Sequence, residues 1–154
     1  GMIAGKTTAR ETKMPDTAPT LKLTSDGAMK ILNAAIGKAQ EMGVPQCISV
    51  VDTGGHLMAF CRMDGAFVMS NTSSRRKAET AAIYGIPTGN IPEGIDIKLA
   101  LVTEGQRVNL PGGLPLIIDG EVVGAIGVGS GTGEQDLAVA KVGVSALEGA
   151  QRFD

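Results

Sequence analysis

A Gly-Gly pair at residues 54 and 55 stands between two apolar segments, and it is the feature that most limits how this chain can fold. The flanking segments, residues 46–53 and 56–62, are rich in β-branched and apolar side chains. Glycines readily adopt the positive φ angles that a two-residue hairpin turn requires. The sequence therefore predicts two short antiparallel strands joined by Gly54 and Gly55.

The register of this hairpin sorts its side chains onto two faces, because directly opposed residues share a face. The predicted pairs are Thr53 with His56, Val51 with Met58, Ser49 with Phe60, and Cys47 with Arg62. The predicted core face holds Ile48, Val50, Leu57, Ala59 and Cys61, with Asp52 at its turn end. The other face is mixed in polarity and carries His56, the only histidine of the chain. The two cysteines fall on opposite faces, so no disulfide between them is expected.

Asp119-Gly120 predicts a second hairpin, since this dipeptide is typical of a type I′ turn. Its strands are expected at residues 114–118 and 121–129, after Pro111-Gly112-Gly113 breaks the chain. One face of this hairpin is expected to hold Ile117, Val122, Ile126 and Val128.

Apolar residues at three- and four-residue spacing predict helices around these hairpins. The first helix begins at Thr24 or Ser25 and ends at Gly43. A polar run at residues 70–74 is expected to cap a second helix that continues to about Tyr84, and a short third helix spans residues 93–103. A last helix begins with a capping box at Thr132 and Gln135, and its apolar stripe is Val139, Val142, Ala146, Leu147 and Ala150.

The elements therefore follow the order helix, hairpin, two helices, hairpin, helix. Hairpins favour antiparallel sheets, so this order predicts an α+β layered domain. We expect one domain over residues 21–154 and a flexible tail over residues 1–20, where Gly1 ahead of Met2 is typical of a tag remnant.

Composition excludes several classes of partner. The net charge of −2 and the few aromatic residues (three Phe, one Tyr, no Trp) do not provide the basic stacking surface of a nucleic-acid-binding protein. No apolar run reaches the roughly 18 residues of a membrane-spanning helix, and the first residues lack the apolar core of a secretory signal. We therefore expect a cytoplasmic protein without nucleic-acid or membrane partners.

His56 is the first candidate for chemistry, as a metal or haem ligand or as a general base. The alternative is a turn residue that only hydrogen-bonds its neighbours. Asp52 at the same turn could carry a proton or could only satisfy backbone amides. Arg62 and Asp64, at the end of the hairpin, could contact a ligand or form a surface ion pair of little energetic value.

A basic cluster, Arg75-Arg76-Lys77, lies near the start of the second helix. Cations oppose the helix dipole at this position. Arg76 and Lys77 are therefore expected either to face an anionic ligand or to be solvated. A pocket between this helix and the first hairpin would combine them with His56.

A glycine-rich run, residues 127–133, precedes the last helix. Its Gly-x-Gly-x-Gly-x-Gly spacing differs from that of a dinucleotide-binding loop, and too little chain follows it to complete such a site. Backbone N–H groups at a helix start can still bind an anion, which makes Gly131 a candidate ligand contact. Gly112 and Gly113 are further candidates, and Asp136 is a candidate proton carrier. Alternatively, the glycines only form a tight turn.

Six motifs in order along the chain resemble the GlcG/HbpS-like family, also called the haem-degrading domain family, which includes the C-terminal domain of PduO-type corrinoid adenosyltransferases. They are Val51-Asp52-Thr53-Gly54-Gly55-His56-Leu57, Arg62-Met63-Asp64-Gly65-Ala66, Lys77-Ala78-Glu79-Thr80-Ala81, Tyr84-Gly85-Ile86-Pro87-Thr88, Pro111-Gly112-Gly113-Leu114-Pro115-Leu116 and residues 120–128 through Gln135-Asp136. The resemblance extends from about Leu23 to Leu147.

The resemblance implies a five-stranded antiparallel sheet flanked by helices, assembled into homodimers or larger rings, commonly octamers. Some members of the family bind haem, degrade it or sense its redox state, and others belong to glycolate or propanediol gene clusters without an assigned activity. In a haem complex His56 would approach the iron, and the propionates would meet Arg62, Arg75, Arg76 or Lys77.

Three functions follow from these residues and the resemblance. The first is haem or tetrapyrrole binding, with haem degradation or redox sensing. The second is a binding protein or enzyme for a small organic acid, whose carboxylate would contact Lys77 or an arginine and the glycine-loop amides, with Asp52, His56 or Asp136 as proton carrier. The third is an oligomeric structural protein without catalysis.

Overall fold

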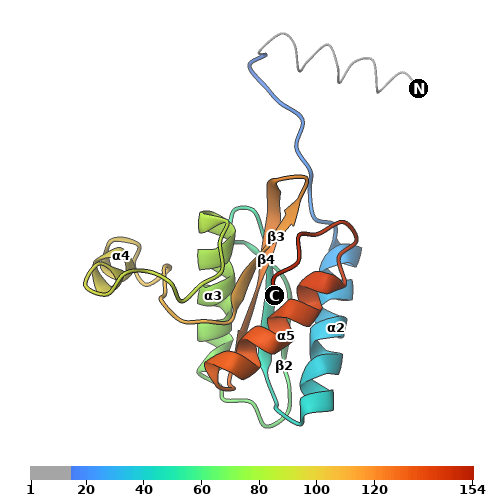
Figure 1. Cartoon of the computed structure of the whole chain (residues 1–154), viewed down its shortest axis with the longest axis vertical. Helices are drawn as coiled ribbons and strands as arrows, with labels where there is room; N and C mark the ends of the chain where they lie inside the picture. The colour runs from blue at the N-terminus through green and yellow to red at the C-terminus, as the bar shows by residue number, and fades with distance from the viewer. Residues whose placement is uncertain (1–14) are drawn as a thin grey trace.

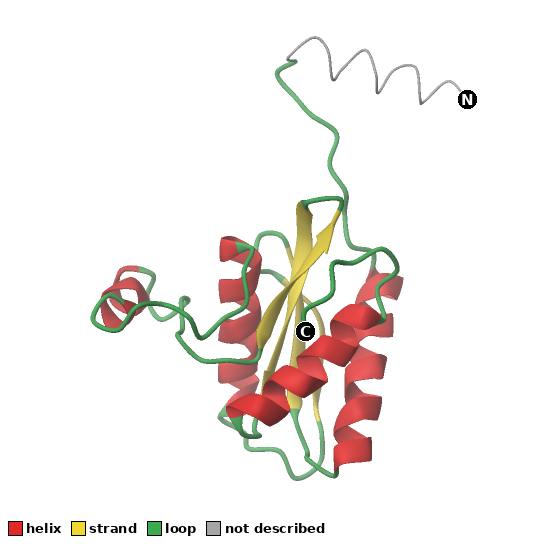
Figure 2. Ribbon diagram, viewed as in Figure 1, coloured by secondary structure: helices red, strands yellow, loops and turns green. Residues whose placement is uncertain are grey.

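The computed structural model describes residues 15–154, which form a four-stranded antiparallel sheet with helices on both faces (Figures 1 and 2). The elements in chain order are α2 (Ser25–Met42), β1 (Cys47–Asp52), β2 (Leu57–Arg62), α3 (Ser70–Tyr84), α4 (Asp96–Val102), β3 (Gly113–Ile118), β4 (Glu121–Gly129) and α5 (Gly133–Ser145). The strand order is β2-β1-β4-β3, so the two hairpins lie side by side. α3 packs on one face of the sheet, and α2 and α5 pack together on the other.

The predicted α+β class is confirmed, but the strand count differs from the family expectation. That expectation was five strands, and the described residues contain four. Beside β3, Ala150 forms a single bridge with Ile118, and the Gln151 N–H donates to the Ile117 carbonyl oxygen at 2.8 Å. The segment that borders β3 is thus paired at one point only, which is too little for a fifth strand.

The predicted tail is described only in part. Residues 15–20 are exposed and contain no helix or strand, and residues 1–14 lie outside the described residues. The domain limits at residues 21 and 154 stay a prediction. In the described part of the chain, no helix is both long enough and apolar enough to cross a bilayer.

The first hairpin has the predicted register at its open end and a different one near the turn. Ser49 pairs with Phe60 and Cys47 with Arg62, as expected. Val51, however, pairs with Leu57 and not with Met58.

The turn explains this difference, because the loop contains three residues and not two. The Gly55 N–H donates to the Asp52 carbonyl oxygen at 3.0 Å, and the Asp52 N–H donates to the His56 carbonyl oxygen at 2.9 Å. Of the two glycines only Gly55 has a positive φ, 82°. The predicted two-residue turn is therefore wrong, and the extra residue produces a bulge that shifts the pairing between Val50 and Val51.

Both faces of β1 are buried. Ile48 and Val50 join Ala59 in the core under α2 and α5, as predicted, whereas Leu57 is 45% exposed. On the opposite face, α3 covers Val51. Ser49 of this face is buried against Ser74 of α3, whereas Phe60 on the neighbouring β2 is 37% exposed. Cys47 and Cys61 are both free thiols.

The second hairpin forms at Asp119-Gly120 as predicted, with positive φ at both residues, 50° and 79°. A bulge between Leu116 and Ile117 shifts the register, so that Ile117 pairs with Val122. Ile126 and Val128 lie in the core under α2 and α5, but Val122 lies beside Gly85 at the end of α3. The expected common face of Ile117, Val122, Ile126 and Val128 is therefore wrong beyond the bulge.

The four predicted helices are confirmed, with two corrections at their ends. Thr24 caps α2 by accepting from the Gly27 N–H at 3.0 Å, and α5 has the predicted capping box. The polar run at residues 70–74 does not cap α3, because Met69 occupies the N-cap and no side chain bonds there. α5 ends at Ser145, so the last three residues of its predicted stripe follow the helix.

The contact between α3 and β4 depends on the small residues of both elements. Ala78 of α3 packs against Ala125 of β4 in a small buried cluster. A Cβ added at Gly127 would collide with the Ser74 carbonyl oxygen and with the backbone nitrogen of Ala78. The helix therefore lies directly on the strand, and a side chain at Gly127 would separate them.

Gly127→Ala is expected to lower the free energy of unfolding by about 1–3 kcal/mol, because the added methyl group overpacks this contact. A Cβ added at Gly37, in the interior of α2, would meet no atom of another element within 4 Å. Gly37→Ala is the matched control, and it should raise the free energy of unfolding by about 0.5–1 kcal/mol through higher helix propensity. Urea denaturation of the three proteins measures both changes, and equal stability of Gly127→Ala and the parent would contradict the close packing.

Candidate functional site

A buried ion pair between Lys77 and Asp136 joins α3 to the start of α5. The Lys77 Nζ lies 3.0 Å from Asp136 Oδ2, and it also donates to the Val128 carbonyl oxygen at 2.8 Å. Both side chains are more than nine-tenths buried. Removing two charges from water is costly unless they are paired and hydrogen-bonded, and here both conditions are met.

The second oxygen of Asp136 is also occupied. The Gly131 N–H donates to Oδ1 at 2.9 Å, which ties the glycine-rich loop to the first turn of α5. The side-chain amide of Gln46, fully buried before β1, lies beside the same oxygen, and the orientation that satisfies its neighbours has its nitrogen donating to Oδ1 at 2.9 Å and to the Gly129 carbonyl oxygen. Asp136 therefore accepts from three separate segments and holds the end of the sheet together.

Gly112 and Gly113 lie directly against Lys77. Gly112 has a φ of 118°, and a Cβ there would lie 2.6 Å from the Val128 carbonyl oxygen and 3.2 Å from the Lys77 Nζ. A Cβ at Gly113 would lie 2.5 Å from the Lys77 carbonyl oxygen. Glycine is thus required at both positions for β3 to approach the lysine.

A pocket of about 320 Å³ opens beside this ion pair. It is lined by Phe67, Met69, Ser70, Ser73, Lys77, Leu110, Pro111, Ser130, Gly131, Gly133 and Asp136. The structure therefore brings together five predicted site residues, Lys77, Gly112, Gly113, Gly131 and Asp136, which come from four segments of the chain.

His56 and Asp52 form a second candidate site, at the turn of the first hairpin. Asp52 Oδ1 accepts from the N–H groups of Gly54 at 2.9 Å and His56 at 3.0 Å, and it lies 3.2 Å from the His56 Nδ1. Desolvation raises the pKa of Asp52, but the hydrogen bonds from His56 and Gly54 outweigh it, so the pKa lies below its usual value. The His56 side chain is 80% exposed, and Asp52 orients its Nδ1 so that Nε2 faces away.

Two arginines lie near this turn, joined by a glutamate. The buried Glu79 carboxylate accepts from Arg75 Nε at 3.1 Å and from Arg76 Nη1 at 2.8 Å. A Cβ at Gly55 would lie 3.4 Å from the Glu79 Cγ, which places the hairpin turn against this residue. One carboxylate faces two guanidinium groups in this cluster, and the Asp52 carboxylate at the turn balances the remaining positive charge.

Arg62 and Asp64 lie neither at the Lys77–Asp136 pair nor at the hairpin turn. Arg62 pairs with Cys47 at the open end of the hairpin, which is about 20 Å from the turn for strands of this length. Neither residue forms an ion pair with any residue in 15–154. The predicted grouping of His56, Arg62 and Asp64 in one pocket is therefore not observed.

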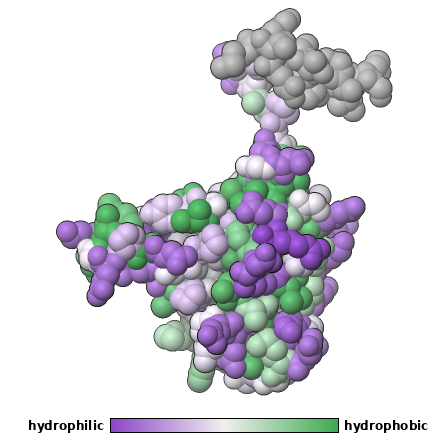
Figure 3. All heavy atoms as spheres, in the orientation of Figure 1, coloured by the Kyte–Doolittle hydropathy of each residue, from purple (hydrophilic) through white to green (hydrophobic). Residues whose placement is uncertain are grey.

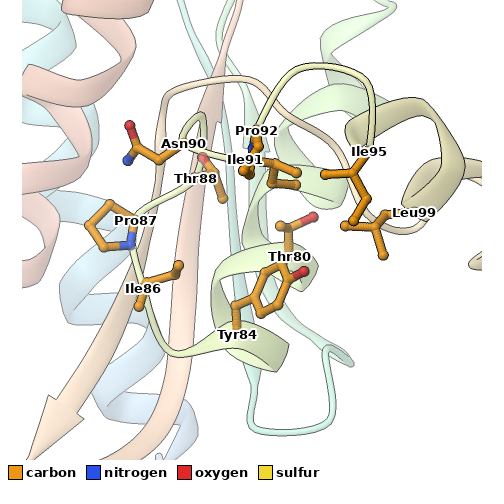
Figure 4. A pocket seen from close by; sticks show the side chains of 10 residues that line it. All are labelled: Thr80, Tyr84, Ile86, Pro87, Thr88, Asn90, Ile91, Pro92, Ile95 and Leu99. Atoms are coloured by element: carbon orange, nitrogen blue, oxygen red, sulfur yellow. The ribbon is translucent and has the colours of Figure 1, made fainter.

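A third hollow, of about 290 Å³ and largely apolar, lies between the end of α3 and residues 86–112, which we term the α4 arm. Figure 4 shows Thr80 and Tyr84 of α3 directed toward Ile91, Ile95 and Leu99 of this arm. Thr80 fixes the arm by donating to the Gln106 carbonyl oxygen at 3.1 Å and accepting from the Val108 N–H at 3.0 Å.

Three residues at these candidate sites were not predicted from the sequence: Glu79, Gln46 and Arg107. Glu79 could have been found, because it stands three and four residues after two arginines on one helix. Gln46 carries no comparable signal, since its partners are distant in the sequence. Arg107 was also missed; its guanidinium carbon lies 2.9 Å from the Tyr84 ring centroid, and burial lowers its pKa.

The residues from 15 to 154 contain no group of three or more His, Cys, Asp or Glu side chains arranged to hold a metal ion. Burial also raises the pKa of Cys47, which keeps its thiol protonated. Cys47 and Cys61 both lie at the open end of the first hairpin, away from His56 at the turn. A haem complex needs only one axial imidazole from the protein, which His56 can provide.

Comparison with known proteins decides the family. A family model described as "Haem degrading protein HbpS-like" matches residues 23–145. The chain belongs to the HbpS-like family. It is 39% identical over 130 residues to an uncharacterized 15.0 kDa protein of the dhaT-dhaS intergenic region of Citrobacter freundii, covering 81% of this chain and 92% of the relative. It is 36% identical over 107 residues to the GlcG protein of Escherichia coli K12, covering 69% and 80%. Its structure is similar to that of the PduOC:Heme complex, with a TM-score of 0.78 at 26% identity, over 87% of this chain and all of the other.

Lys77→Met is expected to lower the free energy of unfolding by about 3–5 kcal/mol, because it leaves the Asp136 carboxylate buried without its counter-charge. Lys77→Met combined with Asp136→Asn should lose much less, since the neutral amide still accepts from Gly131. Guanidinium denaturation measures the difference. An equal loss in the single and double variants would show that the charge pairing contributes little.

Proposed function

We propose that this protein binds haem or a related tetrapyrrole at the hairpin turn. Membership of the HbpS-like family supports the ligand class, and the likeness to the PduOC:Heme complex supports it further. The observation that carries the proposed location is the exposed His56 imidazole, whose Nδ1 faces Asp52 Oδ1 at 3.2 Å. A carboxylate on one ring nitrogen fixes the tautomer that leaves the other free to bind a metal.

The surroundings of His56 fit the rest of such a ligand. Arg75 and Arg76 are held in place by Glu79, next to the turn. Guanidinium groups bind carboxylates strongly through paired hydrogen bonds, so these arginines would hold the propionates. Haem would supply redox chemistry when bound, and oxidative haem breakdown or redox sensing is the activity we propose for the complex. The free cysteines are compatible with action in a reducing cytoplasm.

Haemin titration tests this proposal. The parent chain is expected to shift the Soret band, and His56→Ala should abolish the shift because it removes the axial imidazole. Asp52→Asn is the matched variant, and it should weaken binding by about 10–100-fold through loss of imidazole orientation. Arg152→Ala, on an exposed residue of the C-terminal segment, serves as the control. A Soret shift that is the same in His56→Ala and the parent would contradict the proposal. Haem breakdown is a separate measurement: the Soret band of the complex should decay when a reductant and oxygen are added.

Self-assembly through the α4 arm is a second proposal, supported by its exposed apolar residues. No residue of α4 is buried, and Ile97, Leu101 and Val102 are 62%, 73% and 75% exposed. The arm extends from the body in Figure 1, and hydrophobic residues are visible on its surface in Figure 3. A helix of seven residues is too short to be stable alone. A second copy of the chain would cover it, and the net charge of −2 opposes this little.

Leu101→Glu is expected to shift the protein toward the monomer, because it places a charge in the proposed apolar interface. Lys98→Glu, on an exposed lysine of the same helix, should leave the assembly unchanged. Analytical ultracentrifugation measures the mass of both variants. A parent chain that is monomeric, or an unchanged mass for Leu101→Glu, would contradict an interface at α4.

A further inference from the structure

The ammonium group of Lys77 has one more donor than the acceptors that the structure provides. A lysine carries three N–H donors. Within residues 15–154 its Nζ bonds to two acceptors, the Val128 carbonyl oxygen and Asp136 Oδ2. The side chain is only 6% exposed but lines the pocket of about 320 Å³. A buried charge with an unused donor at a cavity is suited to a ligand acceptor.

The Asp136 carboxylate is not the remaining acceptor. Oδ1 is held by Gly131 and Gln46, and Oδ2 by Lys77 itself. Its position is fixed by these three contacts, so it cannot turn to meet the third donor.

Further donors line the same pocket. Ser70 and Ser73 are among the lining residues, and Gly133 provides the first helical position of α5. The N–H groups in the first turn of a helix have no partner within the helix and carry a partial positive charge. Lys77 and the start of α5 therefore both favour an acceptor that carries negative charge.

The remaining wall of the pocket is apolar. It is formed by Phe67 and Met69, which are 69% and 76% exposed, and by Leu110 and Pro111. Ser130 links this wall to the glycine-rich loop by accepting from the Phe67 N–H at 2.9 Å. Ser130 has a φ of 94°, a strained conformation for a residue other than glycine and one that is concentrated at ligand sites.

We propose that this pocket is a second ligand site, distinct from the hairpin turn, and that it binds a short-chain monocarboxylate. The carboxylate would accept from Lys77 and from the start of α5, and its short apolar chain would contact Phe67 and Leu110. Asp136 repels any anion in this pocket, and the repulsion grows with the charge of the ligand, so a monoanion fits better than a phosphate dianion. The cavity of about 320 Å³ has room for a small ligand of this kind.

Isothermal titration with butyrate tests the site, with butyramide as the neutral analogue of the same shape. The parent chain should bind butyrate and should bind butyramide about tenfold or more weakly, since a hydrogen bond to a charged group contributes about 1.5–3 kcal/mol. Lys77→Met combined with Asp136→Asn should weaken butyrate binding by a similar factor while keeping the fold. Lys38→Met, on the surface of α2, is the matched control and should bind as the parent does.

A steric variant keeps the test independent of the ion pair. Leu110→Trp, on a half-exposed residue that lines the pocket, should fill the pocket without altering Lys77 or Asp136. Absence of butyrate binding to the parent at millimolar concentration, equal binding of butyramide, or unchanged binding in both the steric and the charge variants would each overturn the proposal. Haemin titration of the same variants separates the two sites, because the His56 site should be unaffected.

Discussion

The direct packing of α3 on β4 is the constraint on which the rest of the structure depends. Gly127 allows the helix backbone to lie against the strand, where any side chain would meet the Ser74 carbonyl oxygen. This close approach lets the Lys77 side chain reach the Val128 carbonyl oxygen at 2.8 Å. A larger separation would leave the ammonium group short of the strand and of Asp136, and a buried lysine without these partners would be strongly destabilising.

Helix α3 therefore contributes side chains to two sites that differ in chemistry. Arg75, Arg76 and Glu79 form a charged cluster beside the hairpin turn, whereas Lys77 points to β4 and α5. Successive helical residues are rotated by about 100°, so neighbours in the sequence face different elements. The basic cluster that looks continuous in the sequence is divided by this rotation between a solvent-facing site and a buried one.

Local signals in the sequence were reliable wherever the determining contacts are local. Thr24 and Gly43 limit the first helix, and the capping box of Thr132 and Gln135 begins the last, because the hydrogen bonds involved span only a few residues. The hairpin at Gly54-Gly55 was found, but its loop length was not, since a two-residue and a three-residue loop both use glycine at positive φ. A change of one residue in the loop was enough to move Val51 opposite Leu57.

The sequence by itself determined the order of the elements, the α+β class and the family, together with the residue types available for chemistry. Tertiary structure alone decided which of those residues meet. Lys77 and Asp136 are 59 residues apart, and their ion pair depends on β1 pairing with β4, which joins the two hairpins into one sheet. The same arrangement separates Arg62 from His56, although both belong to one hairpin, because the strands hold the turn and the open end apart. Such contacts arise from the packing of distant segments, for which short-range sequence patterns contain no information.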